Sequence, residues 1–229
     1  MRILYHVPIL HNPSDLGSIA ENVQRKGIAL VGPEHWKKHL ETIDGFWNTI
    51  QGFEFKDAKE LKIYQDGFVA EKEQTGNIVQ ELAEKGSRNY QVIKGLVEKG
   101  AVLMKTEDLD LVKKEVMLVK NLSGSKNIFS KTINYIKYKL SGASILQKRD
   151  GFIAKNINET LGEGETGVLF LGAYHDIVPK LAKDIKIIPL KDEALILEYQ
   201  QNYYLKTKEG RIKELEAYLT SPIKVWNKP

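Results

Sequence analysis

Three apolar runs in the sequence each end at a residue that can ligate a metal ion or move a proton. The runs span residues 3–10, 61–65 and 167–171. The residues that follow them are His11, Asp66 and, after a Gly172 turn, His175. If the runs are parallel strands, their carboxyl ends share one edge of a sheet, which is where open α/β sheets bind ligands. The pattern therefore predicts a metal site at that edge, made by His11, Asp66 and His175.

Each of these residues also has an ordinary structural interpretation. His175 can cap the helix that follows its strand, and His11 can be a structural residue of the first loop. Asp66 precedes Gly67, and an Asp-Gly pair often makes a simple turn. What favours a site is that three such residues follow three strands of one predicted sheet.

Three further residues are candidates for the chemistry around such an ion. Asp15 lies four residues after His11, in a turn-forming cluster where it can also cap a helix. Arg149 and Asp150 lie in a predicted helix ahead of the His175 strand. An arginine can stabilise negative charge on a substrate oxygen, and a carboxylate can accept a proton. A surface charge pair is the alternative interpretation of Arg149 and Asp150.

The composition restricts the kind of site. The chain has 229 residues with 42% hydrophobic and 28% charged content, which suits one α/β domain over residues 1–229. Its net charge of +4 is far from that of an obligate nucleic-acid binder. Because there is no cysteine, any metal must be held by His, Asp, Glu or water. Dinucleotide-binding, Walker A and serine-hydrolase motifs are absent.

Strand and helix signals alternate along the chain. Strands are predicted at the three apolar runs, at 101–104 and near 185–190. Helices are predicted at 16–29, 34–50, 72–85, 88–99, 108–121, 127–140, 144–160, 177–183 and 207–218. This alternation favours a mostly parallel sheet covered by helices on both faces. The helix-rich stretch 107–160 is expected to cap one side of the sheet.

The sequence lacks signals for export or membrane insertion. Residues 1–5 enter a strand directly, without the cationic and apolar segments of a signal peptide. No window approaches the run of about 20 apolar residues that a membrane helix needs. We therefore expect a cytoplasmic protein with no membrane partner.

Two other patterns are weaker. His35 and His39 have the i, i+4 spacing of helical zinc ligands, but the acid precedes the first histidine, so we expect solvated helix residues. Residues 116–149 contain six lysines and Arg149 with no acidic residue, which can attract phosphate groups. The competing hypothesis is thus a non-catalytic protein that binds a nucleotide, a nucleic acid or another partner through the 116–149 stretch.

Residues 149–175 resemble the carboxyl-terminal signature of the TraB/Tiki-type superfamily, which includes pheromone-shutdown proteins and, more remotely, erythromycin-esterase-like and ChaN-like proteins. The likeness lies in Arg149-Asp150-x-x-Ile153-Ala154 and in the strand that ends in Gly172-x-x-His175. The resemblance implies that Arg149, Asp66 and His175 are site residues. The amino terminus departs from the family, because Pro8 stands where its first motif has glycine. Some members are metal-dependent hydrolases.

Together these patterns predict a metal-dependent hydrolase of amide or ester bonds acting on a small-molecule or peptide substrate. Manganese, zinc or cobalt would be held by His11, Asp66 and His175, and would activate water. Asp15 or Asp150 would take the proton, and Arg149 would stabilise the substrate oxygen. Without a metal, the same groups could act as a histidine–carboxylate general base.

Overall fold

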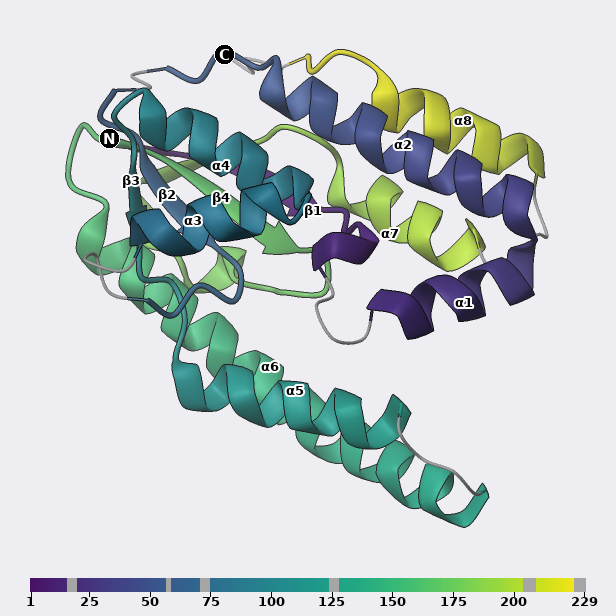
Figure 1. The fold of residues 1–229 in the computed structure, drawn as a ribbon. Coiled ribbons are helices and arrows are strands. Elements are labelled where there is room, and N and C mark those ends of the chain that lie inside the picture. Colours follow the sequence, from purple (N-terminus) through teal and green to yellow (C-terminus); the bar gives the residue numbers. More distant parts are fainter. Residues whose placement is uncertain (16–19, 57–58, 71–74, 124–127, 204–208, 225–229) are drawn as a thin grey trace.

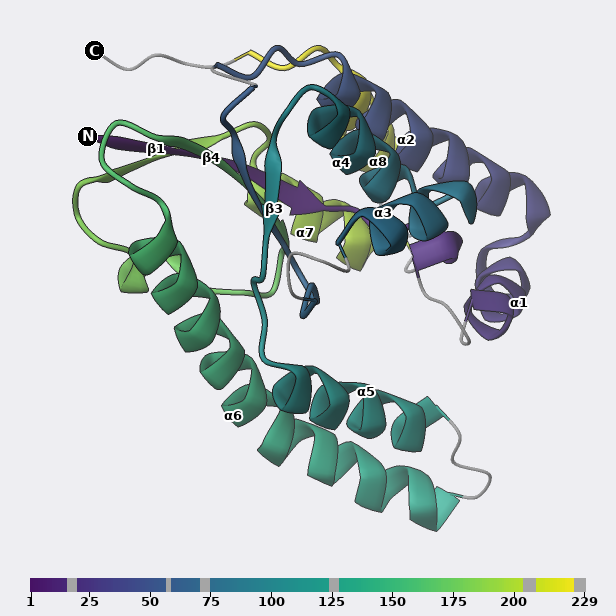
Figure 2. The same ribbon diagram turned by 60° about the vertical axis from the view of Figure 1, so that its left-hand side comes forward.

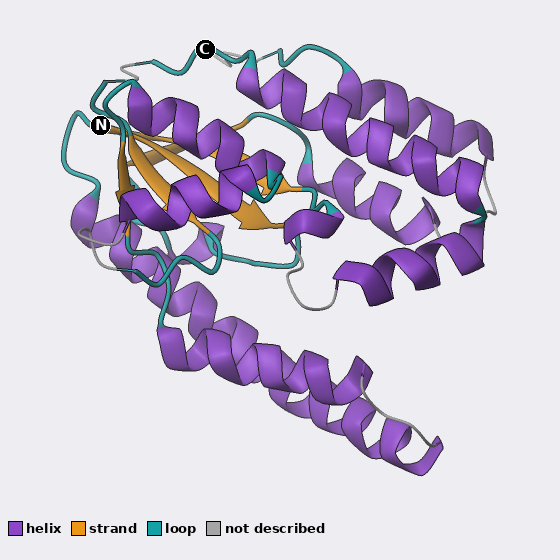
Figure 3. Cartoon of the chain, viewed as in Figure 1, coloured by secondary structure: helices purple, strands orange, loops and turns teal. Residues whose placement is uncertain are grey.

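Five parallel strands form one sheet at the centre of the protein (Figures 1 and 3). The computed structural model describes residues 1–15, 20–56, 59–70, 75–123, 128–203 and 209–224, and side chains within these ranges except at 122–140. The strands are β1 (Arg2–Ile9), β2 (Lys62–Gln65), β3 (Val102–Met104), β4 (Thr166–Gly172) and β5 (Ile185–Pro189). Their spatial order is β3-β2-β4-β1-β5, and every pairing is parallel. The predicted α/β fold is confirmed.

Helices lie on both faces of the sheet. They are α1 (Ala20–Val31), α2 (Pro33–Gln51), α3 (Thr75–Glu84), α4 (Arg88–Glu98), α5 (Leu109–Ser123), α6 (Ile128–Thr160), α7 (Glu193–Tyr203) and α8 (Glu209–Thr220). Local sequence explains several starts: Pro33 opens α2, where its missing N–H costs nothing, and the Ser87 hydroxyl caps α4 by accepting the Tyr90 N–H. Among the described residues, no helix is both long and apolar enough to cross a membrane.

The strands are buried on both faces, so the sheet separates two hydrophobic cores. The larger core joins β1 residues such as Val7 to α2, α4, α7 and α8, with Trp47 and Tyr199 fully buried. The smaller core packs Leu4, Leu169 and Leu171 against Ile153 and Ile157 of α6 and against Leu161, which directly follows that helix. The helices that follow β1 and β2 therefore lie on the face of the larger core, and α6, which follows β3, packs on the face of the smaller core. Loops that diverge in this way leave space at the carboxyl ends of the strands.

The two helices that follow β3 form an antiparallel pair that projects beyond the sheet (Figure 2). Only the carboxyl-terminal part of α6 covers the sheet, through the smaller core. The stretch expected to cap the sheet at 107–160 is therefore a helical hairpin, and only its end nearest the sheet packs on the sheet.

Several predicted element boundaries were wrong. The break expected at Gly142 does not occur, since α6 runs through it; a helix tolerates one glycine at a cost of about 1 kcal/mol. The helix expected at 177–183 is only a three-residue turn, Val178–Lys180, that contains Pro179. Helix α7 was not predicted, because its apolar residues 194–197 are contiguous and hide the helical period. The predicted helix starts at residues 16, 72 and 207 lie outside the described residues.

Candidate functional site

Three potential metal ligands converge at the carboxyl edge of the sheet, after the neighbouring strands β3, β2 and β4. They are Glu107, Asp66 and His175 in that strand order, and their ligand atoms all lie within 4.8 Å of one another. Two of the three, Asp66 and His175, were predicted as ligands from the sequence. Within the described residues, no other group of three such side chains meets this criterion.

Asp66 is held against the end of β4. Its N–H donates to the Phe170 carbonyl at 2.9 Å, which extends the β2–β4 ladder by one residue. Its Oδ2 accepts the Gly172 N–H at 3.1 Å. A Cβ at Gly172 would lie only 3.1 Å from that oxygen, so any larger residue would make the carboxylate shift by a few tenths of an ångström. Gly172 therefore fixes the carboxylate at the strand end.

Glu107 is the most deeply buried member of the cluster, with a fully inaccessible side chain. The loop that carries it is pinned by backbone bonds from Thr106 and Glu107 to the Phe68 carbonyl, at 2.9 and 3.0 Å. Burial and the nearby charge of Asp66 raise the pKa of Glu107, against the opposing effect of Arg149. A buried carboxylate of this kind needs a cation.

Arg149 of α6 supplies that cation by joining three carboxylates. Its Nη2 donates to Asp66 Oδ1 at 2.5 Å and to Glu107 Oε1, and its Nε donates to Glu107 Oε2 at 3.1 Å. Its Nη1 donates to Glu115 of α5. Burial alone would lower the pKa of Arg149, but the surrounding carboxylates raise it well above its usual value. Four of the five guanidinium N–H groups are thus used inside the protein.

His175 is oriented by Asp150, the residue after Arg149. Its Nδ1 lies 2.6 Å from Asp150 Oδ1, and Asp150 Oδ2 accepts the Asp176 N–H at 3.2 Å. Burial opposes ionisation of Asp150, but these two bonds and the charge of Lys180 lower its pKa. Because Asp150 is ionised and only accepts, His175 must donate from Nδ1. Its Nε2 is then turned toward Asp66.

The contact between His175 and Asp66 identifies where a cation fits. Nε2 of His175 lies 3.6 Å from Asp66 Oδ2. In a neutral ring with a protonated Nδ1, this nitrogen presents a lone pair to a carboxylate oxygen, and two acceptors repel unless a proton or a cation lies between them. Burial would lower the pKa of His175, but Asp150 and Asp66 raise it overall. Burial likewise opposes ionisation of Asp66, yet His175, Arg149 and His11 keep its pKa low.

The charge balance of the cluster also favours an added cation. Its carboxylates are Asp66, Glu107, Glu115 and Asp150. Even with His175 protonated, the direct ion pairs to these four carboxylates in the described part of the chain come from three cations, Arg149, His175 and Lys180. The three ligands offer one imidazole nitrogen and carboxylate oxygens, a donor set that manganese, zinc and cobalt accept. The residues therefore fit a divalent ion.

His11 and Asp15 lie beside this cluster rather than in it. His11 is half-exposed, with Nδ1 3.8 Å from Asp15 Oδ2. Asp15 accepts the Ser87 hydroxyl at 2.5 Å and the Asn12 N–H at 2.8 Å. His11 still acts on the site, because its charge contributes to the low pKa of Asp66. The structure thus pairs His11 with Asp15 and brings Glu107, rather than His11, together with Asp66 and His175.

Two acidic residues of the cluster were missed in the sequence. Glu107 lies three residues after β3, as His175 lies three residues after β4, so the strand-end rule applied to all strands would have found it. Thr106-Glu107-Asp108 also marks a helix start, and this interpretation is correct, since Asp108 Oδ1 accepts the N–H groups of Asp110 and Leu111 at 3.0 Å just before α5 begins at Leu109. Glu115 carries no comparable signal, because its role depends on how α5 packs on α6.

A second buried histidine lies close to the cluster on the smaller-core face. A cavity of about 10 Å³ is lined mainly by apolar side chains together with His6, His175 and Glu193. Nε2 of His6 is buried and has no hydrogen-bond partner among the described residues. Burial lowers the pKa of His6 to about 4, so this ring is neutral at pH 7. The cavity has room for about one water molecule.

The expectation for the histidines of α2 was half correct. His35 is exposed, as predicted, but His39 is buried, which contradicts the prediction of a solvated residue. Its Nδ1 lies 2.8 Å from the Tyr199 hydroxyl, and its ring stacks on Tyr203 with centroids 4.2 Å apart. His39 faces inward because α7, which was not predicted, packs on that side of α2.

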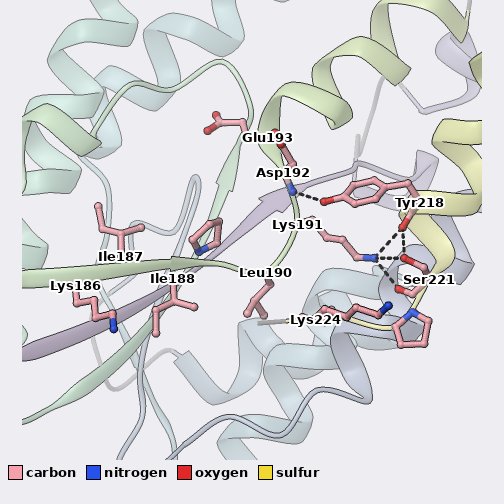
Figure 4. A pocket seen from close by; sticks show the side chains of 13 residues that line it. Lys186, Ile187, Ile188, Leu190, Lys191, Asp192, Glu193, Tyr218, Ser221 and Lys224 are labelled. Carbon is pink, nitrogen blue, oxygen red and sulfur yellow. Dashed lines mark hydrogen bonds between the residues drawn. The ribbon is translucent and has the colours of Figure 1, made fainter. Parts of the chain in front are cut away.

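A groove of about 950 Å³ lies between β5 and the end of α8 (Figure 4). Lys191 lies in its wall and donates to the carbonyls of Tyr218 and Ser221 at 2.9 and 2.7 Å. A lysine at the carboxyl end of a helix satisfies free carbonyls and complements the helix dipole. Lys191 therefore fastens α8 to the sheet, and the size of this groove does not make it the reactive site.

Comparisons with known proteins gave no relative from which a function could be inferred. No family model, no curated protein and no solved structure matches the chain. The cluster at the sheet edge is thus the basis for the functional assignment that follows.

Proposed function

We propose that the protein is a metal-dependent hydrolase of amide or ester bonds in small molecules or peptides. The observation that carries this proposal is the convergence of Asp66, Glu107 and His175 within 4.8 Å. A divalent ion held by these residues would lower the pKa of a bound water and polarise the substrate carbonyl. The TraB/Tiki-type resemblance agrees with this chemistry and with the roles of Asp66 and His175.

Asp150 serves in this mechanism as a positioning residue. It fixes His175 with Nδ1 protonated and leaves Nε2 available at the site, as carboxylates do for many ligating histidines. Asp150 is therefore less suited to accept a proton from water than we expected from the sequence. Arg149 is likewise engaged, since it holds Asp66, Glu107 and Glu115 together and keeps their charges balanced.

We assign proton transfer to the pair formed by His11 and Asp15. Asp15 is held by Ser87 and Asn12 and lies 3.8 Å from His11 Nδ1, so it can stabilise a protonated His11. His11 is exposed enough to exchange protons with solvent. In this assignment His11 accepts the proton from the attacking water and returns it to the leaving group.

Metal content is the first test of the proposal. Untagged wild-type protein incubated with manganese, zinc or cobalt should retain one of these ions at near-equal stoichiometry. His175→Ala and Glu107→Gln should lose it, whereas His35→Gln, which changes an exposed histidine of α2, should not. Absence of any bound ion in the wild type, or equal binding by His175→Ala, would remove the metal mechanism.

Hydrolysis separates the metal ligands from the proposed base. With a panel of activated esters and anilides, His175→Ala should abolish turnover. His11→Ala should retain the ion but lower kcat by about 10²- to 10⁴-fold, the usual contribution of a general base. Equal kcat values for His11→Ala and wild type would reject the role of His11 and leave the metal site standing.

The competing hypothesis of a phosphate-binding 116–149 stretch is weakened at one of its basic residues. Arg149 was counted in the basic 116–149 stretch, but it is buried among carboxylates and does not face solvent. Lys126 lies outside the described residues, as do the side chains of Lys131, Lys137 and Lys139. The observed contacts thus favour the hydrolase over a phosphate-binding role for Arg149.

A further inference from the structure

The outer face of α5 combines apolar and basic side chains that are exposed to solvent. Five of its residues share one side of the helix because they are three or four positions apart, or are neighbours in the sequence. They are Leu109, Lys113, Val116, Met117 and Lys120. All five are exposed, and Met117 is 65% accessible. We call these five residues the α5 outer face.

Exposure of single apolar residues is ordinary, but their grouping here is not. Leu109, Val116 and Met117 are three of the eight large hydrophobic residues that are exposed in the described part of the chain. The helix that carries them packs on α6 and extends beyond the sheet (Figures 1 and 2). No other described element covers the α5 outer face, and a flat partner can therefore reach it.

The charge of this region selects the kind of partner. Helix α5 contains two acidic residues, Asp110 and Glu115, and Glu115 is paired with Arg149. Asp110 is thus the acidic residue of α5 whose charge can offset the lysines of the outer face. The sequence from 116 to 149 contains no Asp or Glu. Two copies of such a region would repel each other through their positive charges. The phosphates of a nucleic acid could pair with the lysines, but they would make no apolar contact with Val116 and Met117. An anionic lipid surface suits both kinds of side chain.

We infer that the α5 outer face docks on an anionic phospholipid membrane, with α5 parallel to the lipid surface. The apolar side chains would enter the headgroup boundary while Lys113 and Lys120 contact lipid phosphates. This inference is independent of the proposed hydrolase. It revises our expectation of no membrane partner, which considered only segments that cross a bilayer.

Flotation of the full chain with vesicles tests the inference. The wild type should float with phosphatidylserine vesicles and not with phosphatidylcholine vesicles, and high salt should release it. Lys113→Glu and Met117→Glu should each lower the partition coefficient by roughly tenfold or more. Lys26→Glu and Leu30→Glu are matched controls, because they make the same changes at exposed positions of α1; each should change binding by less than about twofold.

Other occupants of the face give different results. No flotation with phosphatidylserine at low salt would overturn the inference, as would equal loss of binding in the α1 controls. Concentration-dependent dimerisation that Met117→Glu abolishes, without vesicle binding, would assign the face to a second copy instead. Thermal melts of all four variants exclude unfolding as the cause of a loss, because these side chains are exposed and should leave the midpoint nearly unchanged.

Discussion

The carboxyl edge of the sheet and the helical layer of α2 and α7 each bury a histidine that bonds through Nδ1. At the sheet edge, His175 lies between Asp150 and Asp66, and these carboxylates raise its pKa although burial opposes this. In the helical layer, His39 lies between Tyr199 and Tyr203, and burial lowers its pKa to about 4. Similarly buried histidines thus have pKa values that are shifted in opposite directions.

The difference shows what distinguishes a reactive cluster from a packed polar group in this protein. His39 satisfies its Nδ1 with a neutral hydroxyl and otherwise acts as an aromatic core residue. The sheet edge instead gathers more negative charge than its arginine, lysine and histidine balance. Charges of this kind are costly to bury unless they hold a cation, which is why the edge and not the helical layer is the candidate site.

The largest effect should come from removing the cation that holds the sheet edge together. Arg149→Met leaves Asp66 and Glu107 as buried, unpaired carboxylates, and we expect it to lower the free energy of unfolding by about 3–5 kcal/mol. Arg211→Met breaks an accessible pair with Glu198 and should cost much less than Arg149→Met, because solvent screens exposed ion pairs. Urea unfolding at about pH 7 measures both values.

A second variant makes the Arg149 test independent of whether the single variant folds. Arg149→Met combined with Glu107→Gln removes one of the unpaired charges, so it should recover part of the lost stability. The cost of Arg149→Met relative to the wild type should also shrink as the pH falls, because Glu107, with its raised pKa, becomes protonated first. A cost for Arg149→Met no larger than that of Arg211→Met would contradict the charge argument.

The fold was easier to predict than the composition of the site. Alternation of strands and helices indicated the parallel sheet, and the ends of β2 and β4 indicated Asp66 and His175. These signals are local, since each depends on residues within a few positions. The strand-end rule also applied to β3, but Thr106-Glu107-Asp108 has an equally good local interpretation as a helix start. Both interpretations hold in the structure, because Asp108 caps α5 while Glu107 joins the cluster with Asp66 and His175.

The particular side-chain contacts between distant elements could not be predicted from the sequence. Arg149 and Asp150 adjoin in α6, yet one contacts carboxylates of three other segments and the other contacts His175 after β4. His39 shows the same limit, because its burial depends on α7, more than 150 residues further along the chain. Side-chain roles that depend on tertiary packing therefore required the coordinates, whereas the elements themselves did not.

An intermediate effect should appear in how stability depends on pH. The folded pKa of His39 is about 4, against 6.5 for a free histidine, so the unfolded chain binds a proton first as the pH falls. Stability is consequently lost between about pH 6.5 and pH 4, by about 2 kcal/mol at about pH 5. His39→Asn keeps an acceptor near the Tyr199 hydroxyl and should remove the part of the loss that is due to His39, as seen by urea unfolding at about pH 7 and pH 5, while the similar part due to His6, whose folded pKa is also about 4, should remain.

His175 should respond in the opposite direction in protein kept metal-free with a chelator. Because its folded pKa is raised, the stability that it contributes is complete below about pH 6.5 and is lost as the pH rises through the folded pKa. Histidine NMR titration should show His175 changing above pH 6.5 while His39 and His6 stay neutral until near pH 4. Titration of all three rings near pH 6.5 would be incompatible with the contrast between the two regions.

The smallest effect should come from neutralising the partner of His175 while keeping its shape. Asp150→Asn still offers an oxygen to Nδ1, but it removes the negative charge that stabilises the protonated ring. We expect the pKa of His175 to fall and the free energy of unfolding below about pH 6 to drop by about 1 kcal/mol, the difference between a charged and a neutral hydrogen bond. Asp176→Asn, a neighbouring exposed carboxylate, is the control and should leave both values nearly unchanged. If Asp150→Asn behaved like Asp176→Asn, Asp66 alone would account for the raised pKa, and the orienting role of Asp150 would lose its electrostatic support.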